Sequence, residues 1–344
     1  MTYVSQDQAA AAIVGIDIGS VTVAMVALAP DKTVIDRAYA FHGGKISETV
    51  TRMLSQFDLS AVTAVAATES TPSVVCADAR IDNPIAIIAA VRHCHGRVGS
   101  ILNVGGEQFG LLLFDRQNHY RGYRTNTSCA AGTGSFLDQQ AGRLNLSGIA
   151  ALAETAASNR GEIPKIASRC AVFAKTDLIH AQQEGYSIAE ICDGLCQGLA
   201  KNIVSTLFKH ETVNTPLIFS GGVARNPAVV QHIGDQIGID IVVDDMAPFY
   251  GAMGAAISLL EEAGLPRKTR SIDQRPLVQS FSEQRTYGHE PLQLRHSDYP
   301  DFAAESSCEF TPADAVGKNA NEAFEAPAVE VDVYQSLSAA DTVS

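Results

Sequence analysis

Three glycine turns, each placed at the end of a short apolar run, constrain the fold of this chain most. They are Gly19-Ser20, Gly105-Gly106 and Gly221-Gly222. The first two turns lead straight into another apolar run and so predict β-hairpins, whereas the third leads through Asn226-Pro227 into a helical pattern. Because glycine lets backbone N–H groups approach an anion closely, three such turns in one chain predict a phosphate-binding cleft.

Strand-like and helix-like patterns alternate along the first 264 residues. Strands are predicted at 11–18, 21–28, 62–67, 101–104, 111–114, 217–219 and 239–243. Helices are predicted at 46–57, 83–94 and 251–260, and residues 136–210 read as a lobe of helices. The alternation predicts a layered α/β fold with two domains, 11–128 and 129–264. Residues 265–344 are rich in Ser, Gln, Pro and Glu, and we expect this tail to be mostly extended or disordered.

Charge and cysteine content exclude several classes of protein. The formal net charge of −13 argues against binding to nucleic acid or to an anionic membrane, since both need clustered Lys and Arg. The apolar runs are too short or too interrupted to span a bilayer, so we expect a soluble protein. The seven cysteines are odd in number, and the opening residues lack the features of a signal peptide. We therefore expect a reducing cytoplasm, in which the thiols are free or bound to metal.

Asp17 stands at the end of the first apolar run, directly before the first glycine turn. An aspartate at this position is suited to bind Mg²⁺ directly or through water. Taken alone, the segment is more typical of an ordinary hairpin, and the two further glycine turns are what favour the nucleotide interpretation. Two other nucleotide folds lack their fingerprints here. No Gly-x-Gly-x-x-Gly opens a helix after the first strand, and no glycine-rich turn ends in Lys-Ser or Lys-Thr.

Cys129 and Cys170 each precede a stretch that reads as the start of a helix. A helix N-terminus favours a thiolate or an anionic cluster, and a cubane iron-sulfur cluster needs four thiolates, which two chains of a symmetric dimer would supply. The alternative is that both cysteines are small core residues. Cys192 and Cys196 are spaced i, i+4 on an apolar helix face, which favours core thiols over a metal pair. Cys94, between two histidines, is interpreted as part of a surface helix end.

Five segments carry a resemblance to known proteins: GIDIGSVT, NVGGEQ, CAAGTGSFLDQQ, RCAVFAKTDLI and SGGVARNP. The order of the glycine turns is similar to that of the actin and hexokinase superfamily of ATPases (ASKHA). In that superfamily two hairpins from opposite domains grip the phosphates and a late Gly-Gly turn holds the adenosine. Over about residues 13–260 the chain more specifically resembles the BadF/BadG/HgdC family. Its members are activators of 2-hydroxyacyl-CoA dehydratases and ATPase subunits of benzoyl-CoA reductases.

The resemblance implies a fold, cofactors and partners. The implied fold is actin-like (ribonuclease H-like) α/β, with two duplicated domains and a helical lobe at the cluster site. The implied assembly is a homodimer that binds ATP and Mg²⁺ and shares one 4Fe-4S cluster, held by Cys129 and Cys170 of each subunit. Such a protein takes an electron from reduced ferredoxin or flavodoxin. It delivers this low-potential electron, driven by ATP hydrolysis, to a dehydratase or reductase component on another chain.

The same resemblance assigns roles to residues at the glycine turns. Asp17 would bind Mg²⁺, and Glu107 would orient the attacking water or accept its proton, so both are the candidate catalytic residues. The implied ATP-binding residues are Gly19, Ser20, Thr22, Gly105, Gly106, Gly132, Thr133, Gly134, Gly221, Gly222, Val223 and Asn226.

Both phosphate hairpins depart from the family pattern. Residues 19–24 read Gly-Ser-Val-Thr-Val-Ala where relatives have Gly-Ser-Thr-Thr-Thr-Lys, and 103–108 read Asn-Val-Gly-Gly-Glu-Gln where relatives have Asp-x-Gly-Gly-Gln-Asp. Nucleotide binding is therefore indicated more firmly than rapid hydrolysis. One alternative is an ASKHA metabolite kinase without a cluster, for which Asp115 is the nearest candidate base. The other is a degenerate nucleotide-binding scaffold module of a larger tandem activator, since 330–334 is similar to the linker before a second module.

Overall fold

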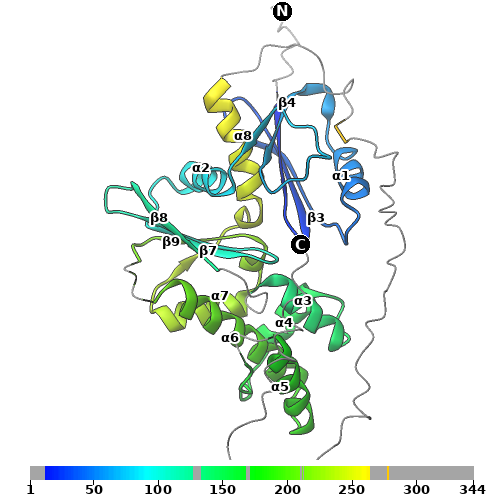
Figure 1. Cartoon of the computed structure of the whole chain (residues 1–344), viewed down its shortest axis with the longest axis vertical. Coiled ribbons are helices and arrows are strands. Elements are labelled where there is room, and N and C mark those ends of the chain that lie inside the picture. The colour runs from blue at the N-terminus through cyan, green and yellow to red at the C-terminus, as the bar shows by residue number, and fades with distance from the viewer. Residues whose placement is uncertain are drawn as a thin grey trace, which may run out of the picture. The chain divides into compact units, whose positions relative to one another are not determined.

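A computed structural model describes residues 12–126, 133–167, 171–209, 211, 213–263 and 277–278 of the chain (Figure 1). The strands are β1 (Ala12–Ile18), β2 (Thr22–Leu28), β3 (Val34–Phe41), β4 (Val62–Thr68), β5 (Ala79–Ile81), β6 (Ser100–Val104), β7 (Phe109–Phe114), β8 (Tyr120–Thr125), β9 (Leu217–Ser220) and β10 (Ile241–Val242). The α-helices are α1 (Ile46–Leu54), α2 (Asn83–His95), α3 (Gly134–Arg143), α4 (Ile149–Ala157), α5 (Ala171–Gln183), α6 (Ile188–Leu207), α7 (Pro227–Ile237) and α8 (Tyr250–Ala263). Short 3-10 turns are η1 (Leu59–Ala61), η3 (Gly222–Arg225) and η4 (Ala247–Phe249).

The strands form two sheets with the same connectivity. The first sheet has the order β3-β2-β1-β4-β5, and the second has the order β10-β9-β6-β7-β8. In each sheet the first three strands in the chain pair antiparallel, and the fourth returns parallel to the first. The fifth strand then adds in parallel outside the fourth. The α/β unit therefore occurs twice, as expected for a duplicated fold.

Strand β1 is buried on both faces, and the two faces meet different partners. Val14, Ile16 and Ile18 pack into a core that includes Val50 and Met53 of α1. The alternate positions face α8, and a β-carbon on Gly15 would overlap the carbonyl of Ala252, so α8 lies directly against the strand. This alternation places Asp17 on the α8 face as well, at the carboxyl end of the strand.

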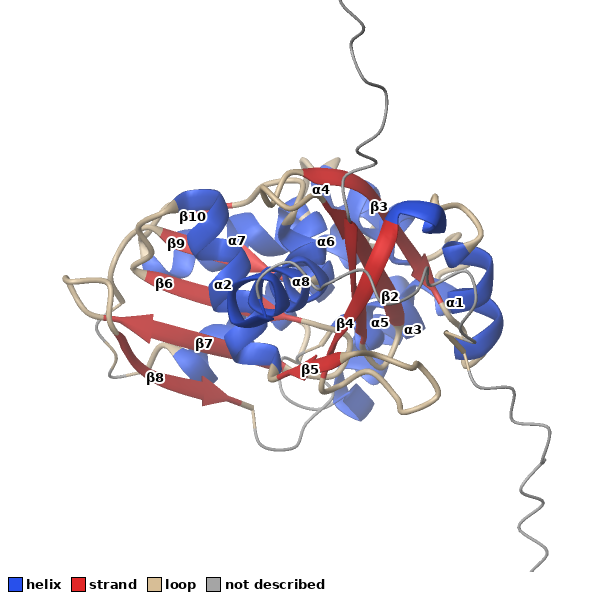
Figure 2. Ribbon diagram, turned by 90° about the horizontal axis from the view of Figure 1, so that it is seen from above, coloured by secondary structure: helices blue, strands red, loops and turns tan. Residues whose placement is uncertain are grey.

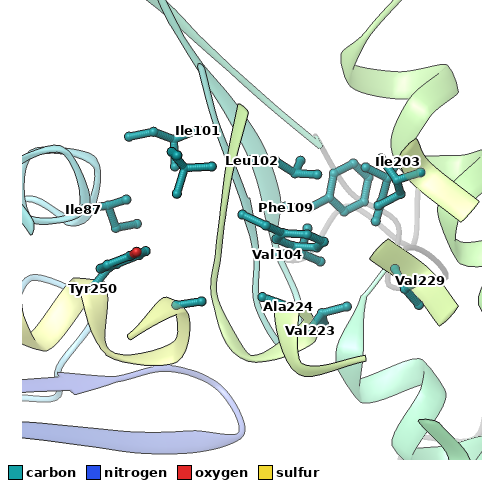
Figure 3. Close-up of a cluster of buried hydrophobic side chains, with 14 of the residues drawn as sticks. Ile87, Ile101, Leu102, Val104, Phe109, Ile203, Val223, Ala224, Val229 and Tyr250 are labelled. Carbon is teal, nitrogen blue, oxygen red and sulfur yellow. The ribbon is translucent and has the colours of Figure 1, made fainter. Parts of the chain in front are cut away.

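Helices α2 and α8 lie between the two sheets (Figure 2). Figure 3 shows how the second sheet is buried from both sides. Ile87 of α2 and Tyr250 of α8 approach Ile101 of β6 from one side, and Ile203 and Val229 belong to helices α6 and α7 on the other. A continuous apolar core thus fixes the two sheets around the last helix, and the carboxyl ends of β1 and β6 open on one cleft.

The predicted strands and helices are confirmed, with shifts of a few residues at their ends. Three strands escaped prediction: β3, β5 and β8. They lie at sheet edges, and their half-exposed faces carry charged and polar residues instead of an apolar run. The last strand of the first sheet ends at Ile81, and the first strand of the second sheet begins at Ser100. The domain boundaries 11–128 and 129–264 stay a prediction.

The stretch 136–210 contains helices α3 to α6, as predicted. The longest, α6, begins with a capping box in which Ser187 accepts the N–H of Glu190 and the Glu190 carboxylate accepts the N–H of Ser187. Within the described parts of the chain, no helix is long and apolar enough to cross a membrane. Of the predicted tail only 277–278 is described, and Val278 forms an antiparallel bridge with Val75. The remainder of that prediction lies outside the described residues.

Candidate functional site

Asp17 is held at the carboxyl end of β1 by hydroxyl groups from the end of β4. Thr68 Oγ1 donates to Asp17 Oδ1 at 2.6 Å, and Ser70 Oγ donates to the same oxygen at 3.2 Å. The other oxygen, Oδ2, lies against Gly251 in the first turn of α8, where a β-carbon would overlap it. Burial raises the pKa of Asp17, and the two hydroxyl donors offset part of this shift because they stabilise the carboxylate.

The loop after β4 is itself fixed to β1. Thr71 Oγ1 accepts the N–H of Ile18 at 3.1 Å, and the Thr71 hydroxyl also lies 3.1 Å from that of Thr68. Arg80 of β5 donates to the carbonyls of Thr71 and of Val75. The hydroxyl groups that contact Asp17 therefore stand on a loop with few degrees of freedom.

The first two glycine turns face each other across the cleft from different sheets. In the first turn the N–H of Gly19 donates to the carbonyl of Thr22 at 3.0 Å, and in the second the N–H of Gly105 donates to Gln108 at 2.8 Å. A β-carbon on Gly106 would lie 2.7 Å from Ser20 Oγ and 2.6 Å from a methyl group of Val21. Only glycine at position 106 permits this approach.

His42, just after β3, ties the first hairpin to its own strand. The backbone N–H of His42 donates to the carbonyl of Val21 at 3.1 Å, and the ring atom Nε2 lies 3.2 Å from the carbonyl oxygen of Gly19. Nδ1 accepts the N–H of Gly44 at 3.0 Å, so in the neutral ring the proton is on Nε2, which donates to Gly19. The histidine thereby orients both ends of the turn.

The third turn links β9 to α7. Gly221 has a φ of +95°, which favours glycine, and its N–H donates to the carbonyl of Ala247 at 2.8 Å. Asn226 caps α7 by accepting the N–H of Val229 at 3.2 Å, and its amide donates to the Cys196 sulfur at 3.4 Å. Asn226 is thus a buried structural cap at the edge of the turn.

A cavity of about 500 Å³, which we call the phosphate cavity, lies where the three turns meet. Nine of the residues predicted from the sequence line it: Asp17, Gly19, Ser20, Thr22, Gly105, Gly106, Glu107, Gly221 and Gly222. Asp17 contributes a partly buried carboxylate, whereas Glu107 is exposed at the second hairpin. No lysine or arginine of the described chain lines this cavity, so an anionic ligand there needs a cation to offset the two carboxylates.

Two predicted residues, Thr133 and Gly134, lie behind the second hairpin. The N–H of Gly134 donates to the carbonyl of Gly105 at 3.0 Å, and the N–H of Ser135 donates to Gly106 at 2.9 Å. Thr133, fully buried, is the N-cap residue of α3. These contacts connect the helical lobe to the glycine turn, so α3 and the second hairpin form one rigid piece. Gly132, also predicted, lies outside the described residues.

A second cavity of about 520 Å³, which we call the nucleoside cavity, adjoins the third turn. Its wall comes from α4, from η3 and from β3, and includes the remaining predicted residues, Val223 and Asn226. Ile149, Ala153 and Val223 make this wall largely apolar, with Glu154 and Arg225 as the charged groups. Such a chamber suits a flat, mostly apolar ring with a few polar edges.

Sequence reasoning missed several lining or supporting residues. Thr68 and Ser70 were missed although their hydroxyls follow a predicted strand, and the carboxyl ends of parallel strands meet at one sheet edge. That placement was the available signal. His42 and Tyr39 gave none, because the edge strand that contains Tyr39 and ends just before His42 was not predicted.

The candidate cluster ligands Cys129 and Cys170 lie outside the described residues. Helix α5 begins at Ala171, directly after Cys170, and α3 begins at Gly134, shortly after Cys129. Among the described residues there is no group of three or more His, Cys, Asp or Glu that is arranged to hold a metal ion.

Cys192, Cys196 and Cys94 lie where the sequence indicated. Cys192 and Cys196 are buried on α6, and burial raises their thiol pKa values to about 11 and about 12, so both stay protonated at neutral pH. Cys94 stands in the last turn of α2, with its sulfur 3.9 Å from the sulfur of Met253. Asp115, the kinase candidate, lies in the β7–β8 turn, where it accepts the N–H groups of Gln117 and His119.

Duplicated sheets, facing hairpins and a third glycine turn define the protein as an actin-like nucleotide-binding α/β protein, which confirms the predicted fold. The chain belongs to the BadF/BadG/BcrA/BcrD ATPase family, whose model matches residues 14–258.

Curated relatives carry activator names. The chain is 32% identical over 178 residues to the 2-hydroxyisocaproyl-CoA dehydratase activator of Clostridioides difficile, covering 49% of this chain and 66% of that protein. It is 28% identical over 166 residues to the (R)-2-hydroxyglutaryl-CoA dehydratase activating ATPase of Acidaminococcus fermentans, covering 48% of this chain and 62% of that protein. The chain thus spans less than two thirds of the length of these relatives.

Solved structures agree on the fold. The activator of 2-hydroxyisocaproyl-CoA dehydratase from Clostridium difficile with bound ADPNP aligns with a TM-score of 0.65 at 26% identity, covering 73% of this chain and 95% of that chain. Component A of the Acidaminococcus fermentans (R)-2-hydroxyglutaryl-CoA dehydratase aligns with a TM-score of 0.66 at 23% identity, covering 73% and 98%. At 23% identity, the similarity to component A shows a shared fold and nothing more.

Proposed function

We propose that this protein is an ATP-dependent activator of a 2-hydroxyacyl-CoA dehydratase or a related CoA-ester reductase. The observation that carries the proposal is the phosphate cavity, in which two hairpins and a Gly-Gly turn converge on one partly buried carboxylate. Family membership and the names of the relatives support the activator role.

In the proposed complex a triphosphate lies between the first two hairpins. The backbone N–H groups of Ser20 and Gly106 are the donors suited to its oxygens, because those of Gly19 and Gly105 already close the two hairpins. The chemistry of the cavity fits Mg²⁺, because Asp17 supplies a fixed carboxylate and no lysine or arginine among the described lining residues competes for the phosphates. Bound Mg²⁺ would supply the positive charge that the cavity lacks.

Glu107 is the residue that we assign to the attacking water. It lies on the second hairpin, directly after Gly106, and is exposed, so its carboxylate reaches solvent at the cavity. From there it can orient a water molecule or accept its proton. The Gly221-Gly222 turn and the adjoining nucleoside cavity are the proposed place of the adenosine.

We further propose that two chains share one 4Fe-4S cluster, held by Cys129 and Cys170 of each. The start of α5 directly after Cys170 supports this, since a helix N-terminus favours an anionic sulfur. Bound in this way, the cluster would supply a low-potential electron. The hydrogen bonds from Gly134 and Ser135 to the second hairpin would transmit a shift of the phosphate-binding turn to the helical lobe.

The partners follow from this role. The protein would receive its electron from reduced ferredoxin or flavodoxin in a reducing cytoplasm and pass it to a dehydratase or reductase component on another chain. Neither nucleic acid nor a membrane is a proposed partner, in keeping with the net charge of −13.

ATP hydrolysis tests the first half of the proposal. Protein purified without oxygen is assayed for Mg²⁺-dependent phosphate release, next to Asp17→Ala and the matched surface control Asp31→Ala, whose carboxylate lies in the β2–β3 turn. We expect Asp17→Ala to abolish turnover and the control to keep it. Equal activity in both variants would contradict the assigned role of Asp17.

Iron and sulfide analysis tests the second half. The proposal predicts about four irons per dimer, and loss of iron and of the dimer-bridging cluster in Cys129→Ser and Cys170→Ser but not in Cys76→Ser. If the protein is colourless but hydrolyses ATP, the proposed ATPase activity stands and the proposed electron-transfer role is contradicted.

A further inference from the structure

One face of β3, an edge strand of the first sheet, contacts the third glycine turn, which follows β9 of the second sheet. A β-carbon on Gly222 would lie 2.6 Å from the hydroxyl oxygen of Tyr39. Arg225 places its guanidinium carbon 4.5 Å from the centre of the Tyr39 ring and 5.7 Å from that of Phe249. Tyr39 and Phe249 meet edge to face at 5.8 Å. Tyr39 is therefore packed among groups that belong to the other half of the protein.

Arg37, two residues earlier on the same strand face, extends this contact. Its guanidinium carbon lies 5.2 Å from the centre of the Phe249 ring, and its Nη1 donates to the carbonyl of Asp245 at 3.2 Å. We call Arg37, Tyr39, Arg225 and Phe249 the Tyr39 latch. Tyr39 and Arg37 place β3 against η3, η4 and the residue pair before η4. The latch therefore holds the two halves together beside the Gly-Gly turn.

The latch stands between the two cavities. Tyr39 and Gly222 line both the phosphate cavity and the nucleoside cavity. The Tyr39 hydroxyl rests against Gly222, so this contact lies where the two cavities share their lining. Burial raises the pKa of Tyr39, so the hydroxyl stays neutral and occupies this contact as an uncharged group.

We propose that Tyr39 is the gate between the phosphate cavity and the nucleoside cavity. A nucleotide that spans both cavities opens the latch, whereas a polyphosphate without a nucleoside leaves it closed. The inference rests on the proposed function, because it takes the ligand to be a nucleoside triphosphate. Opening separates β3 from η3, so the gate ties the presence of the nucleoside to a movement between the two halves.

The gate also sets the apparent affinity. A ligand that binds only the open form has its dissociation constant raised by the inverse of the open fraction. Removing the Tyr39 ring eliminates the cation–aromatic contact that favours the closed form and so increases that fraction. Tripolyphosphate, which occupies the phosphate cavity alone, binds both forms and is insensitive to the change.

Calorimetric titration of the full-length protein with Mg·ATP and with magnesium tripolyphosphate tests the gate. For Tyr39→Ala we expect the ATP dissociation constant to fall about 3- to 10-fold, with that of tripolyphosphate unchanged within about twofold. Tyr120→Ala is the matched control: this half-exposed tyrosine packs on Phe114 at the far edge of the second sheet and should change neither constant.

Three outcomes overturn the gate. The first is that Tyr39→Ala raises the dissociation constant of ATP. The second is that it changes the dissociation constants of both ligands by the same factor, and the third is that it changes neither constant. In each of these the wild type still binds both ligands and the proposed function stands. If the wild type binds neither ligand, the nucleotide site itself fails, and the gate fails with it.

A double-mutant cycle on thermal unfolding tests the contact without any nucleotide. In Gly222→Ala the new methyl group meets the Tyr39 hydroxyl, whereas the ring carbon that carries that hydroxyl is 3.8 Å away, at ordinary contact distance. We expect Gly222→Ala to lower the midpoint by about 3 °C or more, and by less than half as much in a Tyr39→Phe background. Equal losses in both backgrounds would show that the hydroxyl does not rest on Gly222.

Discussion

Replacing Thr68 by valine removes the shortest hydrogen bond to Asp17 while leaving the shape of the site unchanged. Thr68 is fully buried, and its hydroxyl donates to Asp17 Oδ1 at 2.6 Å, so valine, nearly the same size, leaves no cavity. A hydrogen bond to a charged group contributes about 1.5–3 kcal/mol. The second donor, Ser70 at 3.2 Å, remains and retains part of the stabilisation. We therefore expect a loss of about 1.5–3 kcal/mol of unfolding free energy at neutral pH, or roughly 3–10 °C in midpoint.

The loss depends on pH in a defined direction. Because burial places the pKa of Asp17 in the folded protein above the reference value of 3.8, the folded state binds the proton more tightly than the unfolded state. The ionised carboxylate therefore costs stability as the pH rises from 3.8 through the raised pKa. Thr68→Val raises the pKa of Asp17 further. At a pH above this window the variant is therefore less stable than the wild type, and at a lower pH the difference in unfolding free energy becomes smaller.

Chemical unfolding of the nucleotide-free protein at a series of pH values measures this difference. Thr125→Val is the matched control, since its hydroxyl donates to the neutral carbonyl of Phe109 at 3.1 Å and should lose about 0.5–1.5 kcal/mol at every pH. If Thr68→Val loses no more than the control at neutral pH, or loses the same amount in acid, the hydroxyl does not stabilise an ionised Asp17.

Three further substitutions test neighbouring parts of the structure. Asp17→Asn keeps an acceptor for Thr68 but removes the buried charge, so thermal unfolding should show a more stable nucleotide-free protein at neutral pH, and titration should show loss of Mg²⁺-dependent ATP binding. Gly251→Ala brings a methyl group against Asp17 Oδ2 and should weaken Mg·ATP binding at least about tenfold, whereas Gly142→Ala in α3, with open space around it, should leave binding unchanged and raise stability by about 0.5–1 kcal/mol. Val278→Asp puts a charge into the apolar contact beside Val75 and should lower the unfolding midpoint; an unchanged midpoint would show that the tail segment does not pack there.

The sequence was sufficient to predict the buried strands and the glycine turns. Runs such as Ala12–Ile18 and Leu217–Ser220 are buried on both faces, so almost every residue in them is apolar, and the turn that follows is marked by glycine. The convergence of three such turns was predicted from their order and a family resemblance. The cavity that they form depends on how α8 packs on β1, and local pattern does not determine this packing.

Edge strands and the contacts across the cleft escaped prediction for a physical reason. Strand β3 is half exposed, so its composition is set by solvent on one side and by the other half of the protein on the other. Tyr39 and Arg37 therefore look like ordinary surface residues in the sequence. Thr68 acquires its role only because β4 lies parallel to β1, which puts two distant chain segments at one sheet edge.

The central claim is that the three glycine turns and Asp17 form one Mg²⁺–nucleotide site, and a crystal structure with bound Mg·ADPNP tests it most directly. The account predicts the triphosphate between Gly19-Ser20 and Gly105-Gly106, the nucleoside at Gly221-Gly222, and Mg²⁺ bound to an oxygen of Asp17 or to a water that this oxygen holds. A nucleotide bound elsewhere, or a magnesium ion with no link to Asp17, would contradict it.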